Sequence, residues 1–367
     1  MVTPYYYPIV GGTESLIQNI TTELNERRIH ADIMTLNYGM DLKPVWNEKS
    51  EIINGLNIIK VRAAILPRPA RALLINHFVA HFRSKIKQYD IVHFHNDSDL
   101  SFPLFSCRLG MPRLFHCHCL DVNYYYYRRN PMARHILLRS ADIFVALSRF
   151  LSEMLIDLGV PKEKIRIVPN GVDVNRFREG TERKIENLLL FVGRLDPKKG
   201  IPVLLQSLKQ LKTSVNLVMI GPHSYNVEYS KRVVKLIDDF GKKTIHTVTY
   251  LGQVGPEELV RWYQKASVFV MPSLSESFPM VSIESLACGT PVVASNVGAV
   301  PEVIRNYQNG VLIPPNDPAK LADAIQYLLD NADVRLKFGK EGRKWIVQNF
   351  SSEVVIDRLV RIYHTIL

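Results

Sequence analysis

Two carboxylates separated by seven residues are the most chemically suggestive pair in the 367-residue sequence. Glu276 stands just before a predicted helix start, for which Ser277 is a candidate cap and Pro279 an early residue. Glu284 lies about two turns further along that helix. Such carboxylates can accept hydrogen bonds from neighbouring hydroxyls of one ligand, while the amides between them face its phosphates. The alternative is that Glu276 merely favours the helix dipole and Glu284 is solvated.

A cationic turn is the second group that could bind a ligand. Residues 193–200 read Gly-Arg-Leu-Asp-Pro-Lys-Lys-Gly and follow an apolar run that predicts a strand. The guanidinium of Arg194 and the ammonium of Lys199 could clamp a diphosphate at the end of this strand. A solvated basic loop is the alternative interpretation.

Four histidines end two successive predicted strands: His93 and His95 on the first, His116 and His118 on the second. Alternation along a strand puts His116 and His118 on one face and the cysteines that follow each of them on the other, so residues 116–119 cannot all bind one ion. A zinc site built from the four histidines remains an alternative. We favour His118 alone, facing a cleft, for hydrogen bonding or proton transfer; a structural histidine is the competing interpretation.

Short apolar runs alternate with amphipathic stretches along the whole chain. The 3-to-4 spacing of helices is seen at residues 13–28, 73–87 and 321–329. The runs that predict strands lie at residues 90–95, 113–118, 141–147, 165–168, 188–192, 217–220, 248–251, 268–271 and 291–294. Strands that alternate with helices predict parallel sheets covered on both faces.

Ligands of open parallel sheets bind beyond the carboxyl ends of the strands, and glycine-bearing turns are predicted there. These turns contain Gly11-Gly12 (with Thr13 as a candidate cap), Gly193, Gly221 and residues 273–278. Glycine lets backbone N–H groups approach an anion closely. Because four such places are spread over two lobes, we expect a ligand in a cleft between the lobes. The boundary between the lobes is placed by the turn at residues 168–173 and the polar stretch 176–186.

The composition is that of a globular protein with a net charge of +11. Residues 60–149 hold fourteen basic and five acidic residues, an excess that attracts a nucleic acid, an anionic lipid surface or a phosphorylated substrate, or that merely confers solubility. Four cysteines are too few for an extracellular disulfide framework. The sequence also shows no secretory signal and no apolar run of about 18 residues. We therefore expect a cytoplasmic protein.

Taken together, these motifs resemble the retaining GT-B-fold glycosyltransferases of the group-1 (family 4) type over essentially the whole chain. The segments that carry the resemblance are residues 8–14, 115–121, 168–173 (Val-Pro-Asn-Gly-Val-Asp), 191–200, 251–252, the Glu-x7-Glu motif at 276–284, 289–294 and 298–303. The resemblance implies two Rossmann-like, doubly wound parallel-sheet domains that face each other across a cleft. Their expected extents are 1–177 for the acceptor and 178–350 for the nucleotide-sugar, with a helix at 351–367 crossing back onto the first.

The implied activity is transfer of a hexosyl group from a UDP- or GDP-sugar to a glycan or lipid-linked acceptor, with retention of anomeric configuration. No cofactor and no metal are implied, because Arg194 and Lys199 would neutralise the diphosphate leaving group. Glu284 would bind the ribose, and His118 would hydrogen-bond the sugar near its reacting centre. The remaining implied donor contacts are Glu276 with the amides of Ser277, Phe278, Pro279, Met280 and Val281, then Gly11, Gly12, Gly193 and Glu302.

Two departures from the family pattern stand out. Only Val2 and Thr3 of the first strand precede Pro4, so either the chain starts upstream of Met1 or the strand is short. Gly221-Pro222-His223 replaces the commoner glycine-acid-glycine pattern, which leaves the nucleotide base open.

Other functions compete with this one. A second GT-B enzyme, such as a nucleotide-sugar 2-epimerase or a phosphorylase, is the main alternative. A nucleic-acid-binding module would use the positive charge but lacks a recognised motif, and a dehydrogenase lacks Gly-x-Gly-x-x-Gly. Peripheral contact with the inner face of an anionic membrane is suggested by an apolar stripe at residues 74–86 with neighbouring cations, and by the aromatic and basic residues 124–129. An ordinary amphipathic helix would also explain the stripe.

Overall fold

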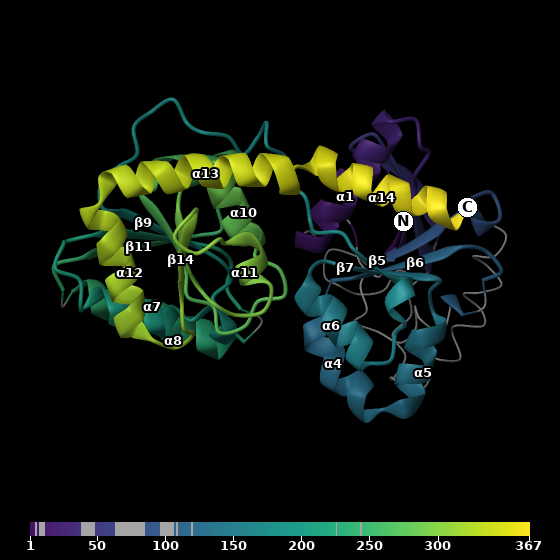
Figure 1. The fold of residues 1–367 in the computed structure, drawn as a ribbon, viewed down its shortest axis with the longest axis horizontal. Helices are drawn as coiled ribbons and strands as arrows, with labels where there is room; N and C mark the ends of the chain where they lie inside the picture. Colours follow the sequence, from purple (N-terminus) through teal and green to yellow (C-terminus); the bar gives the residue numbers. More distant parts are fainter. Residues whose placement is uncertain are drawn as a thin grey trace. The chain divides into compact units, whose positions relative to one another are not determined.

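The structure is a computed structural model that describes residues 1–3, 6, 12–37, 48–62, 85–95, 106–107, 109–118, 120–224, 226–242 and 244–367. The chain forms two compact units (Figure 1). The first unit comprises Met1–Gly171 together with Ser352–Leu367, and the second comprises Val172–Ser351. The division after Gly171 lies a few residues before the position that the polar stretch suggested.

An eight-stranded sheet forms the centre of the first unit, in the order β3-β4-β2-β1-β5-β6-β7-β8. Its strands are β1 (Val2–Thr3), β2 (Ile33–Asn37), β3 (Lys49–Ile53), β4 (Leu56–Arg62), β5 (Val92–His95), β6 (Arg113–Cys117), β7 (Ile143–Ala146) and β8 (Ile165–Ile167). All pairs are parallel except β3 with β4.

The β3–β4 hairpin is the antiparallel exception at the edge of this otherwise parallel sheet. Ile53 pairs with Leu56, so the loop is only Asn54-Gly55. Both loop residues have positive φ, 52° and 78°. A two-residue turn of this kind matches the twist of two antiparallel strands, and Asn-Gly is the pair that adopts it most readily. The pattern of strands alternating with helices could not reveal this edge.

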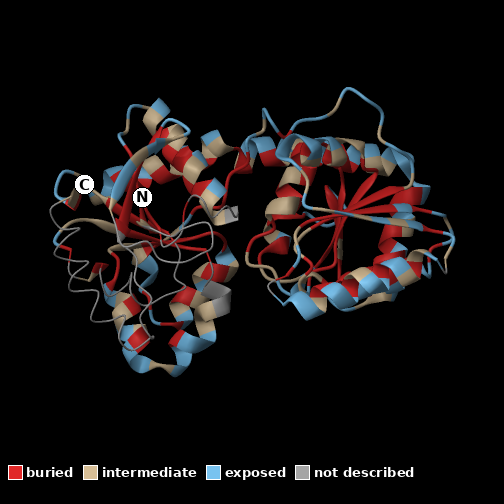
Figure 2. Ribbon diagram, turned by 180° about the vertical axis from the view of Figure 1, so that it is seen from behind, coloured by how far each residue is buried: buried red, intermediate tan, exposed pale blue. Residues whose placement is uncertain are grey.

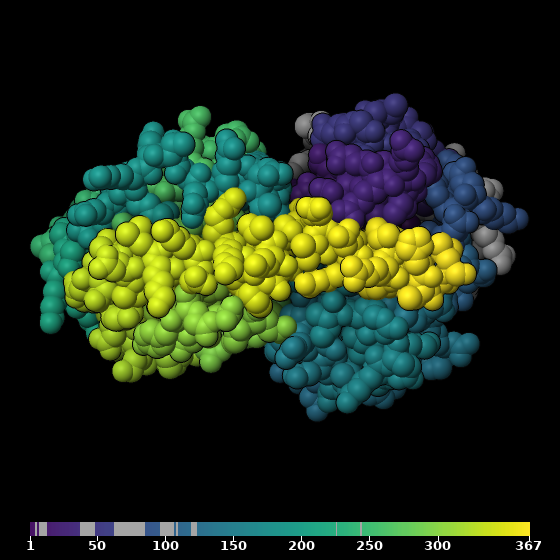
Figure 3. All heavy atoms as spheres, turned by 45° about the horizontal axis from the view of Figure 1, so that its top comes forward, coloured from purple at the N-terminus to yellow at the C-terminus, as the bar shows by residue number. Residues whose placement is uncertain are grey.

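The helix α14 returns the end of the chain to the first unit. The helices here are α1 (Gly12–Glu26), α4 (Leu120–Arg129), α5 (Pro131–Arg139), α6 (Arg149–Asp157), the 3₁₀ turn η1 (Lys162–Lys164) and α14 (Ser352–Ile366). Figure 3 shows α14, in yellow, beside α1, in purple. Leu24 of α1 shares one apolar cluster with Leu359 and Ile362 of α14, and Arg27 pairs with Asp357.

Truncation of Leu359 tests how strongly α14 stabilises this unit. The side chain is fully buried, so Leu359→Ala should lower the free energy of unfolding by about 2–5 kcal/mol, measured by urea denaturation. Glu353→Ala, on the exposed face of the same helix, should change it by no more than about 0.5 kcal/mol. Equal losses in the two variants would contradict the packing role of α14.

The second unit holds a wholly parallel six-stranded sheet in the order β11-β10-β9-β12-β13-β14. The strands are β9 (Leu188–Val192), β10 (Asn216–Ile220), β11 (Thr247–Gly252), β12 (Val268–Met271), β13 (Val292–Ser295) and β14 (Gly310–Ile313). Their neighbours are η2 (Pro197–Lys199), α7 (Ile201–Leu208), α8 (Val227–Gly241), α9 (Pro256–Lys265), α10 (Met280–Ala287), α11 (Val300–Val303), α12 (Pro318–Asp330) and α13 (Ala332–Phe350). Figure 2 shows the strands largely buried and the outer helix faces exposed.

Strand order in the second unit reverses between β9 and β12. The first three strands in the chain run outward on one side, and the next three run outward on the other. At such a topological switch point the loops that leave neighbouring strands diverge and open a crevice at the carboxyl edge. The cationic turn follows β9 and the Glu-x7-Glu motif follows β12, so the fold brings the two predicted groups to this point.

Most predicted elements are confirmed to within a few residues. The strands β2, β3, β4 and β14 were not predicted, and the helix expected at 73–87 lies mostly outside the described residues. In the described ranges, none of the helices has the length and apolar character needed to cross a bilayer. The thiols of Cys107 and Cys117 donate to backbone carbonyl oxygens, those of Ile136 and Phe115, and Cys288 is a buried free thiol.

Candidate active site

Two loops meet at the switch point of the second unit. The Leu274 N–H donates to the carbonyl oxygen of Lys198 at 2.7 Å, which joins the loop after β12 to the turn η2. Gly200 has a left-handed backbone, with φ of +67°, and a Cβ there would lie 2.0 Å from the Pro272 carbonyl oxygen. Only glycine therefore permits this approach, which sets the position of the adjacent Lys199.

Substitution of Gly200 tests this packing. Gly200→Ala should force the two loops apart and lower the free energy of unfolding by about 1–3 kcal/mol. Gly255→Ala offers a matched control, because a Cβ at Gly255 meets no atom within 4 Å. Urea denaturation of both variants measures the effect. A Gly200→Ala variant as stable as Gly255→Ala would show that the loop contact does not require glycine.

Lys199 and Glu276 form an ion pair across these loops. The Lys199 Nζ lies 2.6 Å from Glu276 Oε2, and the side chains are 24% and 13% exposed. Ser273, which is fully buried, donates its hydroxyl to the same carboxylate oxygen at 3.4 Å. The sequence motifs assigned Lys199 and Glu276 to the same ligand, and the structure shows that the two side chains are adjacent. Ser273 was missed as a partner, since serine in such a loop carries no distinctive signal.

The glycines after β9 and β10 serve close packing, which corrects the expectation that their amides face an anion. The Gly193 N–H donates to the Ile220 carbonyl oxygen at 2.8 Å, so this amide is already engaged. A Cβ on Gly221 would lie 2.1 Å from the Gly193 carbonyl oxygen. Arg194 extends from this crossing and donates from Nη1 to the carbonyl oxygen of His223 at 3.1 Å. The loops after β9 and β10 therefore support each other and hold the guanidinium at the edge.

Helix α10 begins later than the sequence suggested. Pro279 occupies the cap position without a side-chain hydrogen bond, and the Met280 N–H donates to Phe278 O at 3.0 Å. Ser277 therefore lies outside the cap, and the prediction that it caps the helix is wrong. The same holds for Thr13, which is inside α1. In both places the residue directly before the first helical residue is not the one that carries the hydroxyl. A side chain caps a helix from that position, so neither Ser277 nor Thr13 can be the cap.

Glu284 is held by a buried tyrosine. Tyr263 of α9, itself fully buried, donates its hydroxyl to Glu284 Oε2 at 2.8 Å. Burial raises the pKa of Glu284 to about 7, against smaller opposing effects of the Tyr263 hydrogen bond and the charge of Arg176. The interpretation of Glu284 as a solvated helix residue is therefore wrong. Tyr263 was not predicted, because the contact joins two helices that no local motif connects.

The remaining predicted residues border the same edge. The Ala299 N–H donates to the Glu276 carbonyl oxygen at 3.3 Å, which joins the loop before α11 to the motif. Glu302 lies on α11 and is half-buried. Phe278 is buried against Phe350, whereas Val281 is half-buried.

His118 lies in the first unit, directly after β6. It is buried and its ring stacks on His116, with the centroids 4.3 Å apart, which confirms that the two share a face. His118 Nε2 lies 3.1 Å from His95 Nδ1. Burial lowers the pKa of His118 to about 3, so the imidazole is neutral near pH 7. Gly12 is the first residue of α1, and Gly11 lies outside the described residues.

Sequence comparisons match both halves of the chain to families of the same kind. The family described as glycosyl transferases group 1 matches residues 173–345, and glycosyltransferase family 4 matches residues 10–176. A D-inositol 3-phosphate glycosyltransferase of Acidothermus cellulolyticus is 30% identical over 365 residues, covering 87% of this chain and 78% of the relative. An uncharacterized glycosyltransferase of Methanocaldococcus jannaschii is 26% identical, covering 99% and 97%.

Solved structures show the same architecture. Sucrose-phosphate synthase from Thermosynechococcus elongatus has a TM-score of 0.81 at 24% identity, with 99% of this chain and 98% of that chain covered. Anabaena Alr3699/HepE in complex with UDP-glucose has a TM-score of 0.80 at 17% identity, with 99% of each chain covered. The fold, a mixed α/β chain with two predominantly parallel sheets, is thus that of the GT-B glycosyltransferases.

Proposed function

Because the chain belongs to the group 1 glycosyltransferase family, we propose that it transfers a hexosyl group from a UDP- or GDP-sugar to a glycan or lipid-linked acceptor, with retention of anomeric configuration. The observation that supports this most is the ion pair of Lys199 and Glu276 at the switch point of the second unit, with Glu284 on the helix α10 that follows the same loop. A cation beside two carboxylates suits a ligand that carries both phosphate and hydroxyl groups.

The donor's diphosphate would bind to Lys199 and Arg194. Lys199 is paired with Glu276 in the structure, so the diphosphate would compete with this carboxylate for the ammonium. As the glycosidic bond breaks, negative charge accumulates on the leaving nucleotide, and two fixed cations stabilise it. The reaction would then need no divalent ion, and a donor phosphate oxygen would accept the acceptor's proton.

The rest of the donor would lie along the Glu-x7-Glu motif. Glu284, positioned by Tyr263, would accept hydrogen bonds from the ribose hydroxyls. Glu276 and the loop amides around residues 277–281 would contact the transferred sugar, with Glu302 at the border. Release of Glu276 from Lys199 on donor binding would leave its carboxylate available to the sugar hydroxyls.

The first unit would bind the acceptor. His118 would hydrogen-bond the sugar as a neutral imidazole, and Gly11 and Gly12 would lie beside the phosphates. The excess of positive charge over residues 60–149 favours an anionic acceptor. Phosphate-bearing polyols are one such class, since several relatives are named for inositol phosphate.

Thermal unfolding with a panel of UDP- and GDP-sugars tests the proposal. The correct donor, at 100 times its Kd, should stabilise the protein by about 2.7 kcal/mol. Incubation of that donor with anionic and glycan acceptors should yield a product whose anomeric configuration, read by NMR, equals that of the donor. Donor turnover to an epimer without any acceptor would instead favour the epimerase, although the relatives named above are glycosyltransferases. Stabilisation by none of the nucleotides would contradict the proposal.

The proposal also includes association with an anionic membrane, and α4 and α5 are the helices that would contact it. Tyr125 and Met132 are 61% and 75% exposed, and Arg128 and Arg129 lie close to them in the sequence. Aromatic side chains with neighbouring cations suit the surface of an anionic bilayer. The apolar stripe at 74–86 lies mostly outside the described residues.

Co-sedimentation with vesicles tests this surface. The protein should bind vesicles containing an anionic phospholipid at low salt and be released at high salt. Tyr125→Ser combined with Arg128→Ser should weaken binding about tenfold or more, because each cation near such a surface contributes about 1 kcal/mol. Lys337→Ser, in the second unit, is the control. Membrane association would be contradicted if the protein bound neutral vesicles as well as anionic ones. It would also be contradicted if the double variant bound anionic vesicles as well as Lys337→Ser does.

A further inference from the structure

Four histidine rings gather on one face of the sheet in the first unit. His93 and His95 lie on β5, His116 lies on the adjacent β6, and His118 follows β6 directly. Their ring centroids are 4.2 Å apart for His93 and His95, and 5.3 Å apart for His116 and either of these. Each ring is at most 8% exposed. The proposed transfer reaction uses His118 and gives no role to the other three.

Three of these histidines leave ring nitrogens without a partner or with a weak one. His93 Nε2 and both ring nitrogens of His116 are buried and find no hydrogen bond among the described residues. His95 Nε2 faces the Met1 Sδ, a weak acceptor, at 3.3 Å. A buried polar atom without a partner is costly, so a cluster of them is unusual. One ligand nitrogen from each of His93, His95 and His116 lies within 4.8 Å of the others.

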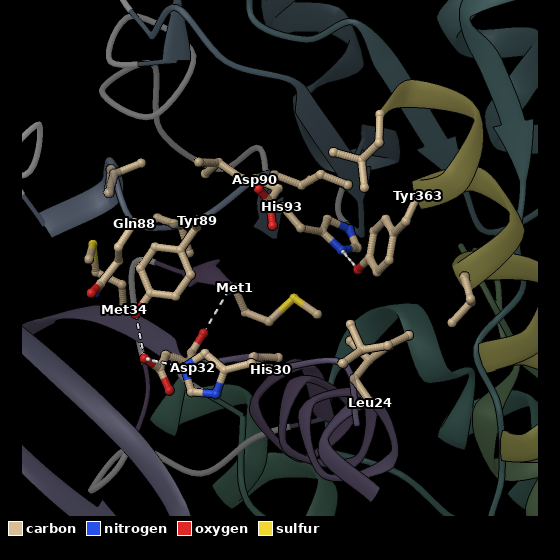
Figure 4. Close-up of a pocket in the computed structure, with 18 of the residues that line it drawn as sticks. Met1, Leu24, His30, Asp32, Met34, Gln88, Tyr89, Asp90, His93 and Tyr363 are labelled. Atoms are coloured by element: carbon tan, nitrogen blue, oxygen red, sulfur yellow. Dashed lines mark hydrogen bonds and ion pairs between the residues drawn. The ribbon is translucent and has the colours of Figure 1, made fainter. Parts of the chain in front are cut away.

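We propose that His93, His95 and His116 bind one first-row transition-metal ion, with Zn²⁺ as the ion to test. The hydrogen bond of His93 supports this assignment. Its Nδ1 lies 2.7 Å from the Tyr363 hydroxyl, as Figure 4 shows, which leaves Nε2 for the ion. Metal-binding histidines characteristically hold their second nitrogen in such a bond, which orients the ring. Neutral imidazole is the form that binds metal, and burial lowers the pKa of all three rings.

The ligand set is that of a site with an open position. Zinc takes three histidines at about 2.0–2.1 Å and a water or hydroxide as the fourth ligand. The rings of His93 and His116 are nearly parallel, at 6°, so one must rotate to direct its nitrogen at the same ion. Both strands are central in the sheet, so rotation of the rings, rather than movement of the backbone, would close the site.

The site would also influence His118. An ion on His95 Nε2 leaves the proton of that ring on Nδ1, which then donates to His118 Nε2 at 3.1 Å. The tautomer of His118 would thereby be fixed with its own proton on Nδ1. The effect of the metal would thus be confined to residues of the first unit, and it would not depend on which donor the second unit binds.

Titration of the full-length, chelator-treated protein with Co²⁺ and Zn²⁺ tests the proposal. We expect one Co²⁺ per chain with the visible absorption of a tetrahedral nitrogen site, displacement by Zn²⁺, and a higher thermal midpoint with Zn²⁺. His116→Phe keeps a ring but removes two buried nitrogens, so this variant should fold at least as stably without metal, yet lose the absorption and the Zn²⁺ effect. Tyr363→Phe should weaken Zn²⁺ binding about 10- to 100-fold.

His135→Gln is the control, because His135 is an exposed histidine of the same unit and its loss should leave binding unchanged. Absence of a Co²⁺ spectrum in the wild type, or Zn²⁺ binding equal in the wild type and His116→Phe, would overturn the proposal. Donor binding by the second unit is measured separately with UDP- and GDP-sugars, so the two proposals can fail independently.

Discussion

Lys199→Ala is expected to lower kcat/KM for glycosyl transfer by about 1000-fold. Removal of one preorganised group that stabilises charge in a transition state commonly costs 100- to 1000-fold. Lys199 should lie at the upper end because it is a half-buried cation beside the diphosphate site that we propose. Steady-state kinetics with the donor identified by thermal unfolding measures the loss.

Lys198→Ala is the matched control. This neighbouring lysine is exposed and contributes only its backbone carbonyl to the loop contact, so its variant should retain wild-type turnover. Lys199→Ala itself should lose no more than about 1 kcal/mol of stability, because its ion pair with Glu276 is partly solvated. Wild-type activity in Lys199→Ala would show that the donor site has been misassigned.

Donor affinity of the wild type is expected to fall about tenfold for each pH unit below 7. In the donor complex that we propose, Glu284 must be ionised to accept hydrogen bonds from two ribose hydroxyls, and burial raises the pKa of this carboxyl to about 7. Calorimetry with an intact nucleotide-sugar is the suitable measurement, because its phosphodiester groups do not titrate in this range. In buffers of different ionisation enthalpy, binding below pH 7 should release about one proton per donor.

The same carboxyl should affect stability with the opposite sign. Its pKa in the folded chain lies above the ordinary 4.5, so its stabilising contribution is complete below pH 4.5 and is lost as pH rises through about 7. Glu284→Gln should therefore match the wild type in acid and exceed it in stability above pH 7, while binding donor weakly and without pH dependence. A donor affinity of the wild type that is independent of pH would mean that Glu284 does not contact the ribose as a carboxylate.

Local sequence patterns predicted most of this fold because most of its strands are short apolar runs separated by amphipathic helices. The apolar runs at β9 and β12 are buried from end to end, and such runs are characteristic of parallel strands. The rule that ligands bind beyond the carboxyl ends of parallel strands then assigned the turns that hold Lys199 and Glu276 to one ligand before any contact was known. The hairpin at Asn54-Gly55 also had a local signal, but it interrupts the alternation of strands and helices on which the prediction relied.

What the sequence could not reveal depends on contacts between distant segments. One such contact is the hydrogen bond from the Tyr263 hydroxyl to Glu284, and another is the close approach of the Pro272 carbonyl to Gly200. In neither case does the spacing of the two residues in the sequence indicate the contact. The sequence showed the four histidines as two pairs. Which of their ring nitrogens find no hydrogen bond among the described residues depends on burial and ring orientation, and the sequence shows neither. The cap positions failed for a similar reason, because the helix begins two residues later than predicted, so that Pro279 occupies the cap position in place of Ser277.

The return of α14 to the first unit has a consequence during synthesis on the ribosome. The apolar face of α1 is completed by a helix that begins at Ser352, so it remains uncovered while the whole intervening unit is translated. Val172–Ser351 is continuous in the chain and can finish folding before that helix emerges. The nascent protein should therefore expose its earliest apolar surface until α14 leaves the exit tunnel, and holdase chaperones would be expected to bind there in the meantime.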